Sequence, residues 1–492
     1  MATNLRRRTW FAFSILLLVV AGCSATFAQL PTATILGTVK DSTGAVVPDA
    51  TITVRNTETG QVRTDPSGPD GSYRFVALPV GTYEVRTGQT GFQTEIRSGV
   101  TLTVGQEAVI NFSLQVGAIE QRVEVTGEAL LVNTTSGSLG GLVDARQVAD
   151  LPLNGRNYVE LTLLQPGVVE HRPNNKSLSG AGTWFSASGA PPRSNYYLLD
   201  GPPMNSNQDA SAASVGSNTL GVEGIREWRV ITNSSSAEYG MRMGSQMTIV
   251  SKSGSNSLHG SLFEYLRNSA LDARNFFDLK TAVANWRLPP FRRNQYGGSV
   301  GGPIKKDKLF FFATYEGLKD RLGLSTVSNA IGAGCIGPGG TTITNTACPQ
   351  LGTTQSVTIS PVIAPLLALF PSPNLPSTVS GRPPDRVTFP SSRTTDEQYG
   401  QARADYVVSN NDSLFVRYTG DGAERFEPLA YPQFKRVGVT RMQFLTASDV
   451  HTFGSAMVGT FRFSTSKVWS DEDSPSGLSG PQYTFLPGEE MG

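Results

Sequence analysis

The chain has 492 residues, and its 41 lysines and arginines nearly balance its 40 aspartates and glutamates, which gives a formal net charge of +1. The 52 glycines and 30 prolines make up about a sixth of the chain, which favours frequent turns and argues against a helix-rich enzyme. Three of the positive charges, Arg6 to Arg8, lie at the extreme N-terminus, so we expect no basic surface for nucleic acid in the rest of the chain.

Residues 1–28 have the features of a secretory signal peptide. The three arginines precede an apolar run at 10–21, and Thr26 and Ala28 suit cleavage before Gln29. The run is too short to span a bilayer. A lipoprotein signal ending at Cys23 is the alternative. Because no later segment approaches a transmembrane helix, the mature chain can enter a membrane only as a closed β-barrel.

Residues 33–116 contain short alternating strands separated by turn residues, which predicts a β-sandwich. The expected strands are 34–40, 50–56, 72–78, 82–87, 92–97, 100–104 and 108–116. The segment from Gly71 to Phe92 reads GSYRFVALPVGTYEVRTGQTGF, and it closely resembles the carboxypeptidase regulatory-like domain. That resemblance implies a prealbumin-like fold, grouped with carbohydrate-binding-like folds. Its aromatic residues are expected in the core, and sugar binding stays open.

No catalytic or metal site is expected. The histidines, His171, His259 and His451, are far apart in sequence and form no HExxH motif for zinc. A G-x-S-x-G match around Ser299 lies in a glycine-rich strand rather than at a strand-to-helix turn. A G-x-G-x-x-G match at 332–337 runs into proline and glycine, so it indicates a loop and no cofactor.

The segment 119–128 follows the sandwich, and Val123, Glu124, Val125 and Thr126 form its extended centre. It can be read as a last strand of the sandwich. It also resembles the TonB box of outer-membrane active transporters, which implies edge-to-edge pairing with a TonB-like periplasmic energising protein. Strand addition draws its affinity from main-chain hydrogen bonds, so loosely defined side chains are sufficient.

Residues 129–254 contain four ordered segments with a common resemblance. They are LPLNGRNYVELTLLQPGV, NYYLLDGPPMNSN, VEGIREWRVITNSSSAEYG and the start of GSQMTIVSKSGSNSLHGSLFEYLRNSALDARNFFD, which continues to Asp278. Together they resemble the plug domain and first barrel strands of Oar-like TonB-dependent receptors, which have an N-terminal regulatory-like domain. The resemblance implies a small α/β plug inside an antiparallel transmembrane β-barrel.

Within this plug we expect a short helix at 159–164 that buries Leu161 and Leu164, and buried strands at 196–199 and 228–231. Asp200 and Gly201 are expected to make the turn after the first of these strands. We expect five polar residues to join the plug to the barrel wall: Asn154, Arg156, Asp200, Glu223 and Glu227.

Residues 258–492 predict an incomplete outer-membrane β-barrel of about seven strands. Apolar residues recur at every second position, which suits a wall with lipid on one side and a polar lumen on the other. A hairpin is expected from 293–304 to 305–318, and a long loop at 319–393. Export permits a disulfide between Cys335 and Cys348, and two free thiols are the alternative.

The sequence therefore predicts a mainly β protein of the outer membrane that takes up a small ligand of unknown class with energy from a TonB-like partner. Barrels of the resembling family need more strands than about seven, and the chain ends without a terminal aromatic residue, so we expect a longer protein. The alternative is a secreted or surface-attached carbohydrate-binding adhesin without transport. A receptor that signals through its N-terminal domain also stays open.

Overall fold

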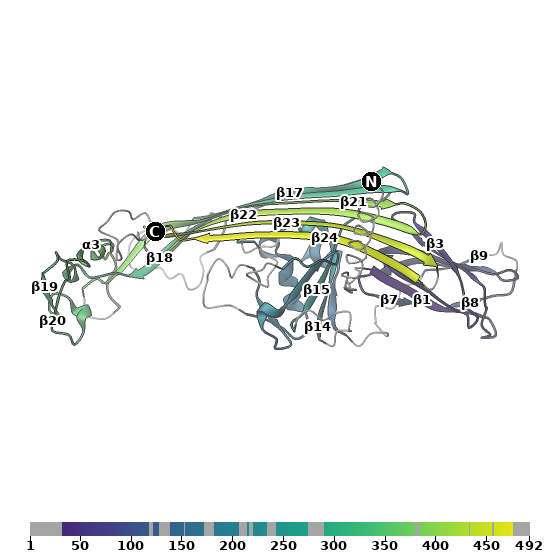
Figure 1. The fold of residues 1–492 in the computed structure, drawn as a ribbon, viewed down its shortest axis with the longest axis horizontal. Helices are drawn as coiled ribbons and strands as arrows, with labels where there is room; N and C mark the ends of the chain where they lie inside the picture. The colour runs from purple at the N-terminus through teal and green to yellow at the C-terminus, as the bar shows by residue number, and fades with distance from the viewer. Residues whose placement is uncertain are drawn as a thin grey trace, which may run out of the picture.

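The computed structural model describes residues 32–117, 122–126, 138–151, 153–171, 182–205, 214–215, 220–233, 243–273, 290–378, 383–431, 433–454 and 457–475. The expected signal peptide lies outside these ranges. Within them, we find no helix of the length and apolar character that crossing a membrane requires. Figure 1 shows an N-terminal domain and an α/β domain that lie along one side of a sheet of very long strands. The predicted mainly β fold is confirmed.

The N-terminal domain is a sandwich of two sheets. Its strands are β1 (Thr32–Asp41), β2 (Thr51–Asn56), β3 (Val62–Pro66), β4 (Ser72–Pro79), β5 (Gly81–Gly88), β6 (Thr94–Leu102), β7 (Glu107–Val109) and β8 (Phe112–Leu114), joined by β9 (Arg122–Thr126). One sheet has the order β4-β1-β7, with β8 also pairing with β1, and the other has the order β3-β2-β5-β6-β9. Alternate residues of both sheets, such as Ile35, Phe75 and Val85, fill the core.

Three strand predictions in this domain need correction. β3 was not predicted, because its short sequence VRTDP shows no alternation of apolar and polar residues. The two strands expected at 92–97 and 100–104 are one strand, β6. The strand expected at 108–116 is divided into β7 and β8, because the chain passes from pairing with one half of β1 to pairing with the other.

The α/β domain follows at residues 138–251. Its elements are β10 (Leu139–Val143), α2 (Ala145–Asp150), η1 (Asn154–Arg156), η2 (Tyr158–Leu164), β11 (Val168–Glu170), β12 (Phe185–Ala187), η4 (Pro192–Ser194), β13 (Tyr196–Leu199), η5 (Val222–Gly224), β14 (Ile225–Asn233) and β15 (Gln246–Ser251). The sheet has the order β10-β14-β15-β13, and only β13 and β15 run parallel. Trp228 of β14 is fully buried and packs against Tyr158, with ring centroids 5.2 Å apart.

The helix expected at 159–164 is the 3-10 helix η2, and it buries Leu161 as predicted. The expected burial of Leu164 is wrong, since 68% of this residue is exposed. Leu164 is the last residue of η2, and the next residue, Gln165, is extended, so the chain turns away from the sheet there.

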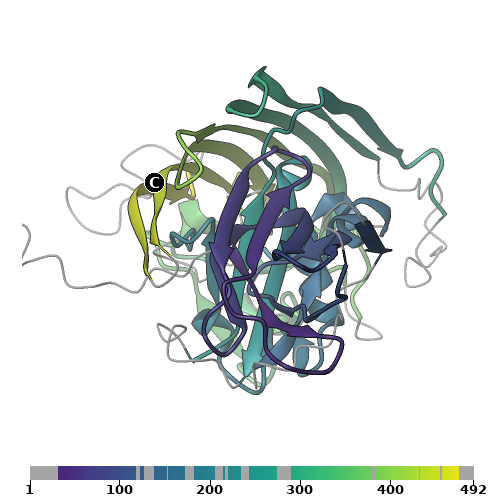
Figure 2. The same ribbon diagram turned by 90° about the vertical axis from the view of Figure 1, so that its right-hand side faces the viewer.

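Seven strands form a single antiparallel sheet, which we call the wall sheet. They are β16 (His259–Asn268), β17 (Phe291–Lys305), β18 (Leu309–Asn329), β21 (Arg386–Val407), β22 (Asp412–Pro428), β23 (Lys435–Gly454) and β24 (Met457–Asp473). Each strand pairs with the next along the chain. Figure 2 shows the sheet arching over the other two domains. Its outer face exposes apolar residues such as Tyr418, Phe461 and Phe463, whereas its inner face buries polar ones.

The predicted loop at 319–393 is wrong at both ends. β18 continues to Asn329 and β21 begins at Arg386, and these strands stay in register along their full length. The abundance of glycine, proline, serine and threonine in 319–393 favoured a loop over strands. Strands form at both ends nevertheless, because pairing with a neighbouring backbone does not require alternating apolar side chains. The loop between β18 and β21 forms a small loop domain at the far end of the sheet, described at residues 330–378 and 383–385 (Figure 1). It contains β19 (Thr342–Thr344), β20 (Ser356–Thr358), α3 (Ala364–Leu367), η6 (Ala333–Cys335) and η7 (Pro349–Leu351).

Candidate functional site

The α/β domain is packed against the inner face of the wall sheet. Met442 and Phe444 of β23 belong to the same buried cluster as Trp228 and Ile249 of the α/β domain. The two parts therefore share one apolar core. Polar contacts at three places add to this apolar contact.

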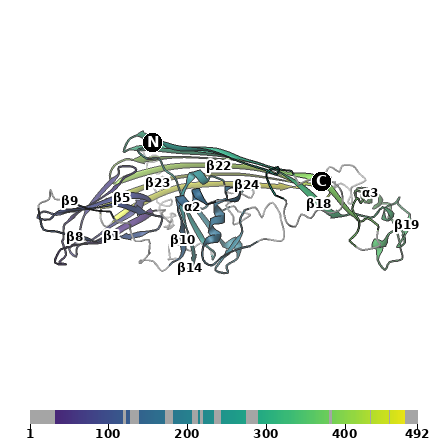
Figure 3. The same cartoon turned by 180° about the vertical axis from the view of Figure 1, so that it is seen from behind.

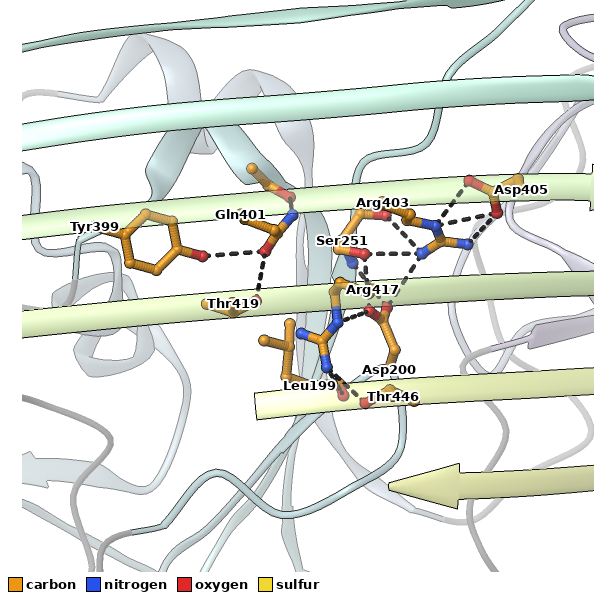
Figure 4. Close-up of polar contacts among 11 residues, drawn as sticks. Leu199, Asp200, Ser251, Tyr399, Gln401, Arg403, Asp405, Arg417, Thr419 and Thr446 are labelled. Atoms are coloured by element: carbon orange, nitrogen blue, oxygen red, sulfur yellow. Dashed lines mark hydrogen bonds and ion pairs between the residues drawn. The ribbon is translucent and has the colours of Figure 1, made fainter. Parts of the chain in front are cut away.

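The first polar contact centres on Asp200, at the turn between β13 and the chain that follows it (Figure 4). Asp200 is fully buried, and its backbone has a left-handed φ of 52°. Its carboxylate lies 3.0 Å from Nε of Arg417 on β22 and 3.5 Å from Nη1 of Arg403 on β21. It also accepts hydrogen bonds from the Ser251 backbone N–H at 2.9 Å and from the Ser251 hydroxyl at 2.7 Å.

The two arginines have further partners. Arg417 is 1% exposed and donates to the Leu199 carbonyl and the Thr446 hydroxyl. Arg403 pairs with Asp405 on its own strand at 2.7 Å. Burial acts to raise the pKa of Asp200, but the two guanidiniums and the Ser251 hydrogen bonds outweigh it, so the pKa is lowered. Asp200 is therefore ionised inside the structure. We call Asp200, Ser251, Arg403 and Arg417 the Asp200 network.

The second polar contact is made by Arg156 of η1, whose φ is 56°. Its guanidinium lies 2.8 Å from Glu223 and 3.3 Å from Glu316, a fully buried residue of β18. Glu316 also accepts hydrogen bonds from the Gln295 amide and the Gly221 backbone N–H. Burial acts to raise the pKa of Glu223, but the hydrogen bonds from Arg156 and from a wall serine outweigh it and lower the pKa.

The third polar contact joins Ser214 and Val215 to the wall. The Ser214 hydroxyl donates to Glu397 of β21 at 2.6 Å. The Val215 backbone N–H donates to the Thr440 hydroxyl of β23 at 3.2 Å. The α/β domain is thus held by residues of several wall strands, among them β16, β18, β21, β22 and β23.

The N-terminal domain is attached to strand β14 of the α/β domain. Arg226 forms two hydrogen bonds with Glu58, at 2.8 and 2.9 Å. Glu227 accepts a hydrogen bond from the Val104 backbone N–H. The expected contact of Glu227 with the wall is therefore wrong, because Glu227 faces the N-terminal domain, as does its neighbour Arg226 at the irregularity near the start of β14. Burial raises the pKa of Glu227 to about 7.

The TonB-box-like segment lies on the N-terminal domain. Residues 122–126, which include Val123, Glu124, Val125 and Thr126, form β9 and pair in parallel with 94–98 of β6. The rest of the predicted segment, at 119–121 and 127–128, lies outside the described residues. The segment thus occupies the position of an additional sandwich strand, which was the other interpretation of its sequence.

A pocket lies where the three parts meet. Its lining includes Glu58 of the N-terminal domain, Arg226 of the α/β domain, and Arg403 and Tyr406 of the wall, and Asp200 also borders it. The Asp200 network therefore faces a cavity on the side of the N-terminal domain. At the other end of the molecule, Cys335 and Cys348 are joined by a disulfide in the loop domain.

The structure brings three predicted plug residues, Arg156, Asp200 and Glu223, to the wall. The side chain of Asn154 lies outside the described residues. The sequence interpretation missed the wall partners, notably Arg417 and Glu316. Their signal was present, because each is a charged residue at an inward position of an alternating strand.

Two family models match the chain. An outer membrane β-barrel domain matches residues 250–490, and a carboxypeptidase regulatory-like domain matches residues 34–115. These matches, with the wall sheet and the sandwich, define an outer-membrane β-barrel protein with an N-terminal regulatory-like domain. Its location is the outer membrane.

The chain is 28% identical over 302 residues to the TonB-dependent transporter Oar of Myxococcus xanthus, which covers 59% of this chain and 27% of that protein. The chain is therefore a homologue of a TonB-dependent transporter, as the sequence resemblance predicted, and spans about a quarter of that relative's length.

Two solved structures are also similar to it. The outer membrane transporter YddB of Escherichia coli has a TM-score of 0.42 at 12% identity, covering 67% of this chain and 38% of that one. The siderophore receptor PirA of Acinetobacter baumannii has a TM-score of 0.37 at 13% identity, covering 69% and 45%.

Proposed function

We propose that the protein takes up a small ligand across the outer membrane, with energy supplied by a TonB-like periplasmic protein. The observation that carries this proposal is the α/β domain bound to the polar inner face of the wall sheet. A domain in that position acts as a plug, and transport requires its ion pairs with the wall to open. The cargo crosses unchanged, so the protein is not an enzyme.

The buried ion pairs support a plug that is held and can be released. A buried ion pair adds less net stability than its short distances suggest, because both charges lose their hydration. Breaking it by exposing both partners to water restores that hydration. The Asp200 network therefore favours one docked position for the plug without making release prohibitively costly.

The β9 segment supports an external source of energy. It precedes the plug in the chain, and its extended backbone is suited to strand addition by a partner. A pull on β9 reaches β10 (Leu139–Val143), which is an edge strand of the plug sheet and, among the residues that the structure describes, pairs with β14 alone. An edge strand can separate one hydrogen-bonded pair at a time, so this is the place where remodelling begins.

The test is growth of the source organism on defined nutrients with the chromosomal gene changed to encode Val123→Pro and Val125→Pro. Proline removes a backbone N–H, so it prevents strand pairing. The control encodes Val123→Thr and Val125→Thr, because threonine is also β-branched and keeps the backbone donors. Both variants must reach the outer membrane in equal amounts. We expect growth on at least one nutrient to be lost only with the prolines; equal growth of the two strains on every nutrient refutes energised uptake.

A further inference from the structure

The pocket where the three parts meet has a side that the docking contacts do not account for. Figures 1 and 3 show the N-terminal domain and the α/β domain next to one another along the wall sheet, and the pocket at this junction has a volume of about 120 Å³. Five of its lining residues are Cα partners across five adjacent strands: Phe310 of β18, Asp405 of β21, Phe415 of β22, Ser448 of β23 and Arg462 of β24. Directly opposite residues share a face of the sheet, so this row forms the wall side of the pocket.

One end of the row offers hydrogen-bond donors. Ser448 is 2% exposed, and its hydroxyl has no hydrogen-bond partner among the described residues. A buried hydroxyl is normally hydrogen-bonded, because leaving it unsatisfied costs free energy. Its direct neighbour across the strands is Arg462, which lines the same pocket. A hydroxyl beside a guanidinium is a donor set that suits a carboxylate, which accepts from both.

The charges around the pocket also favour an anion. Its three acidic residues already have arginine partners: Glu58 with Arg226 at 2.8 Å, Asp405 with Arg403 at 2.7 Å and Asp200 with Arg417 at 3.0 Å. Arg462 adds a fourth guanidinium to these three carboxylates. The residues named here therefore carry one more positive than negative charge, and a bound anion would balance them.

The rest of the row sets the size and polarity of the remainder of a ligand. Phe310 and Phe415 line the pocket beside the polar end, and Leu414 and Val450 add aliphatic surface. The guanidinium of Arg403 covers the Phe415 ring, 4.4 Å from its centroid. A dry cavity of about 150 Å³ holds benzene, so this pocket suits an apolar body of only a few carbon atoms.

We propose that this pocket binds a small organic carboxylate. The carboxylate accepts hydrogen bonds from the Ser448 hydroxyl and the Arg462 guanidinium, and the short apolar body lies against Phe415 and Phe310. Because residues of the N-terminal domain, the α/β domain and the wall all line the pocket, a bound molecule touches all three and stabilises their docking. This site belongs to the docked protein, and the inference holds whether or not the same molecule is transported.

The test measures binding of butyrate to the purified full-length protein by saturation-transfer NMR. Butyramide is the matched neutral ligand, because it has the same chain and nearly the same shape without the charge. The variants are Ser448→Ala and Arg462→Gln. Arg441→Gln is the control, because Arg441 is an exposed residue of β23 that lies over the Trp469 ring and outside the pocket.

We expect saturable binding of butyrate and at least tenfold weaker binding of butyramide. Ser448→Ala should weaken butyrate binding about tenfold. The same substitution should leave the unfolding temperature without ligand unchanged or raise it, since it removes an unsatisfied buried hydroxyl. Arg462→Gln should weaken butyrate binding at least tenfold, and Arg441→Gln should not change it.

Three results would each overturn the inference: no saturable binding of butyrate, equal binding of butyramide, or unchanged affinity in Ser448→Ala. Ser448→Ala leaves every ion pair of the pocket intact, so it keeps the test decisive even if Arg462→Gln does not fold. Uptake is not measured, so a negative result leaves the proposed function standing.

Discussion

The substitution Asp200→Asn tests whether a single buried charge holds the plug against the wall. Asparagine has nearly the same shape, and its side-chain oxygen can still accept the hydrogen bond that the Ser251 N–H donates. What is lost is the negative charge between the Arg417 and Arg403 guanidiniums. The perturbation is therefore electrostatic rather than steric.

The structure sets the size of the effect. Removing one partner of a buried ion pair costs about 3–5 kcal/mol. Arg403 keeps its pair with Asp405, so only Arg417 loses its main counter-charge, and the cost lies near the lower end, at about 3 kcal/mol. Since 1.36 kcal/mol corresponds to a factor of ten, the open state of the plug should become about a hundredfold more populated.

Hydrogen exchange of the purified full-length protein measures this population. The diagnostic amides are those of β13 and the Asp200 N–H, which donates to the Ile249 carbonyl at 2.9 Å. The matched control is Asp49→Asn, because Asp49 also has a left-handed φ, of 56°, but is exposed. Equal exchange in the two variants would refute a holding role for the charge. Adding Arg417→Met to Asp200→Asn should restore most of the protection, since no unpaired charge then remains buried; a double variant as open as the single one would point to the backbone turn instead.

Three further predictions concern the N-terminal domain and the loop domain. Burial raises the pKa of Glu227 to about 7, so ionising this carboxyl opposes docking of the N-terminal domain. The folded protein is therefore most stable below the ordinary pKa of 4.5. Its stability falls as pH rises through 7, and the loss at pH 7 is at most about 3 kcal/mol. Thermal unfolding of the full-length protein should show this decline, Glu227→Gln should remove it, and an unchanged pH profile would contradict it. In a double-mutant cycle, Glu58→Arg and Arg226→Glu should each weaken docking of the N-terminal domain. The double variant, in which the two charges are exchanged, should recover about 1 kcal/mol of unfolding free energy. Strictly additive effects of the two substitutions would exclude a direct interaction. Cys335→Ser should destabilise the loop domain by about 3 kcal/mol, seen as proteolysis confined to residues 330–385; cleavage within the wall strands as well would contradict the independence of that domain.

Patterns local to one strand were readable from the sequence. In the N-terminal domain, alternation around Tyr73 and Phe75 places both rings in the core, where Tyr73 also donates its hydroxyl hydrogen to the Ile110 carbonyl. In the wall, Leu414, Val416 and Tyr418 alternate with Arg417, and the structure buries the arginine while exposing Tyr418. A two-residue period fixes which face a side chain occupies, because successive residues of a strand point to opposite faces.

Contacts between distant segments of the chain could not be predicted from the sequence. The turn at Asp200 was predicted from its sequence, but its partner Arg417 lies 217 residues further along the chain, and only the docking of two domains determines that they meet. The direction of Glu227 depends in the same way on where the N-terminal domain sits. Leu164 shows that burial can be mispredicted even within one helix. An apolar residue at the end of a short helix is buried only if the chain beyond it continues over the core.

For the energised uptake that we propose, the positions of these contacts in the plug sheet imply an order of events under load. The sheet runs β10-β14-β15-β13, and the chain from β9 leads into β10 at one edge. The Asp200 network lies at the opposite edge, where β13 ends and Ser251 closes β15. A pull on β10 therefore first breaks its pairing with β14, whereas the far edge stays fixed to Arg417 and Arg403. Since separating an edge strand breaks a few hydrogen bonds in succession and ejecting the whole domain breaks every wall contact at once, the arrangement favours partial remodelling of the plug over its removal.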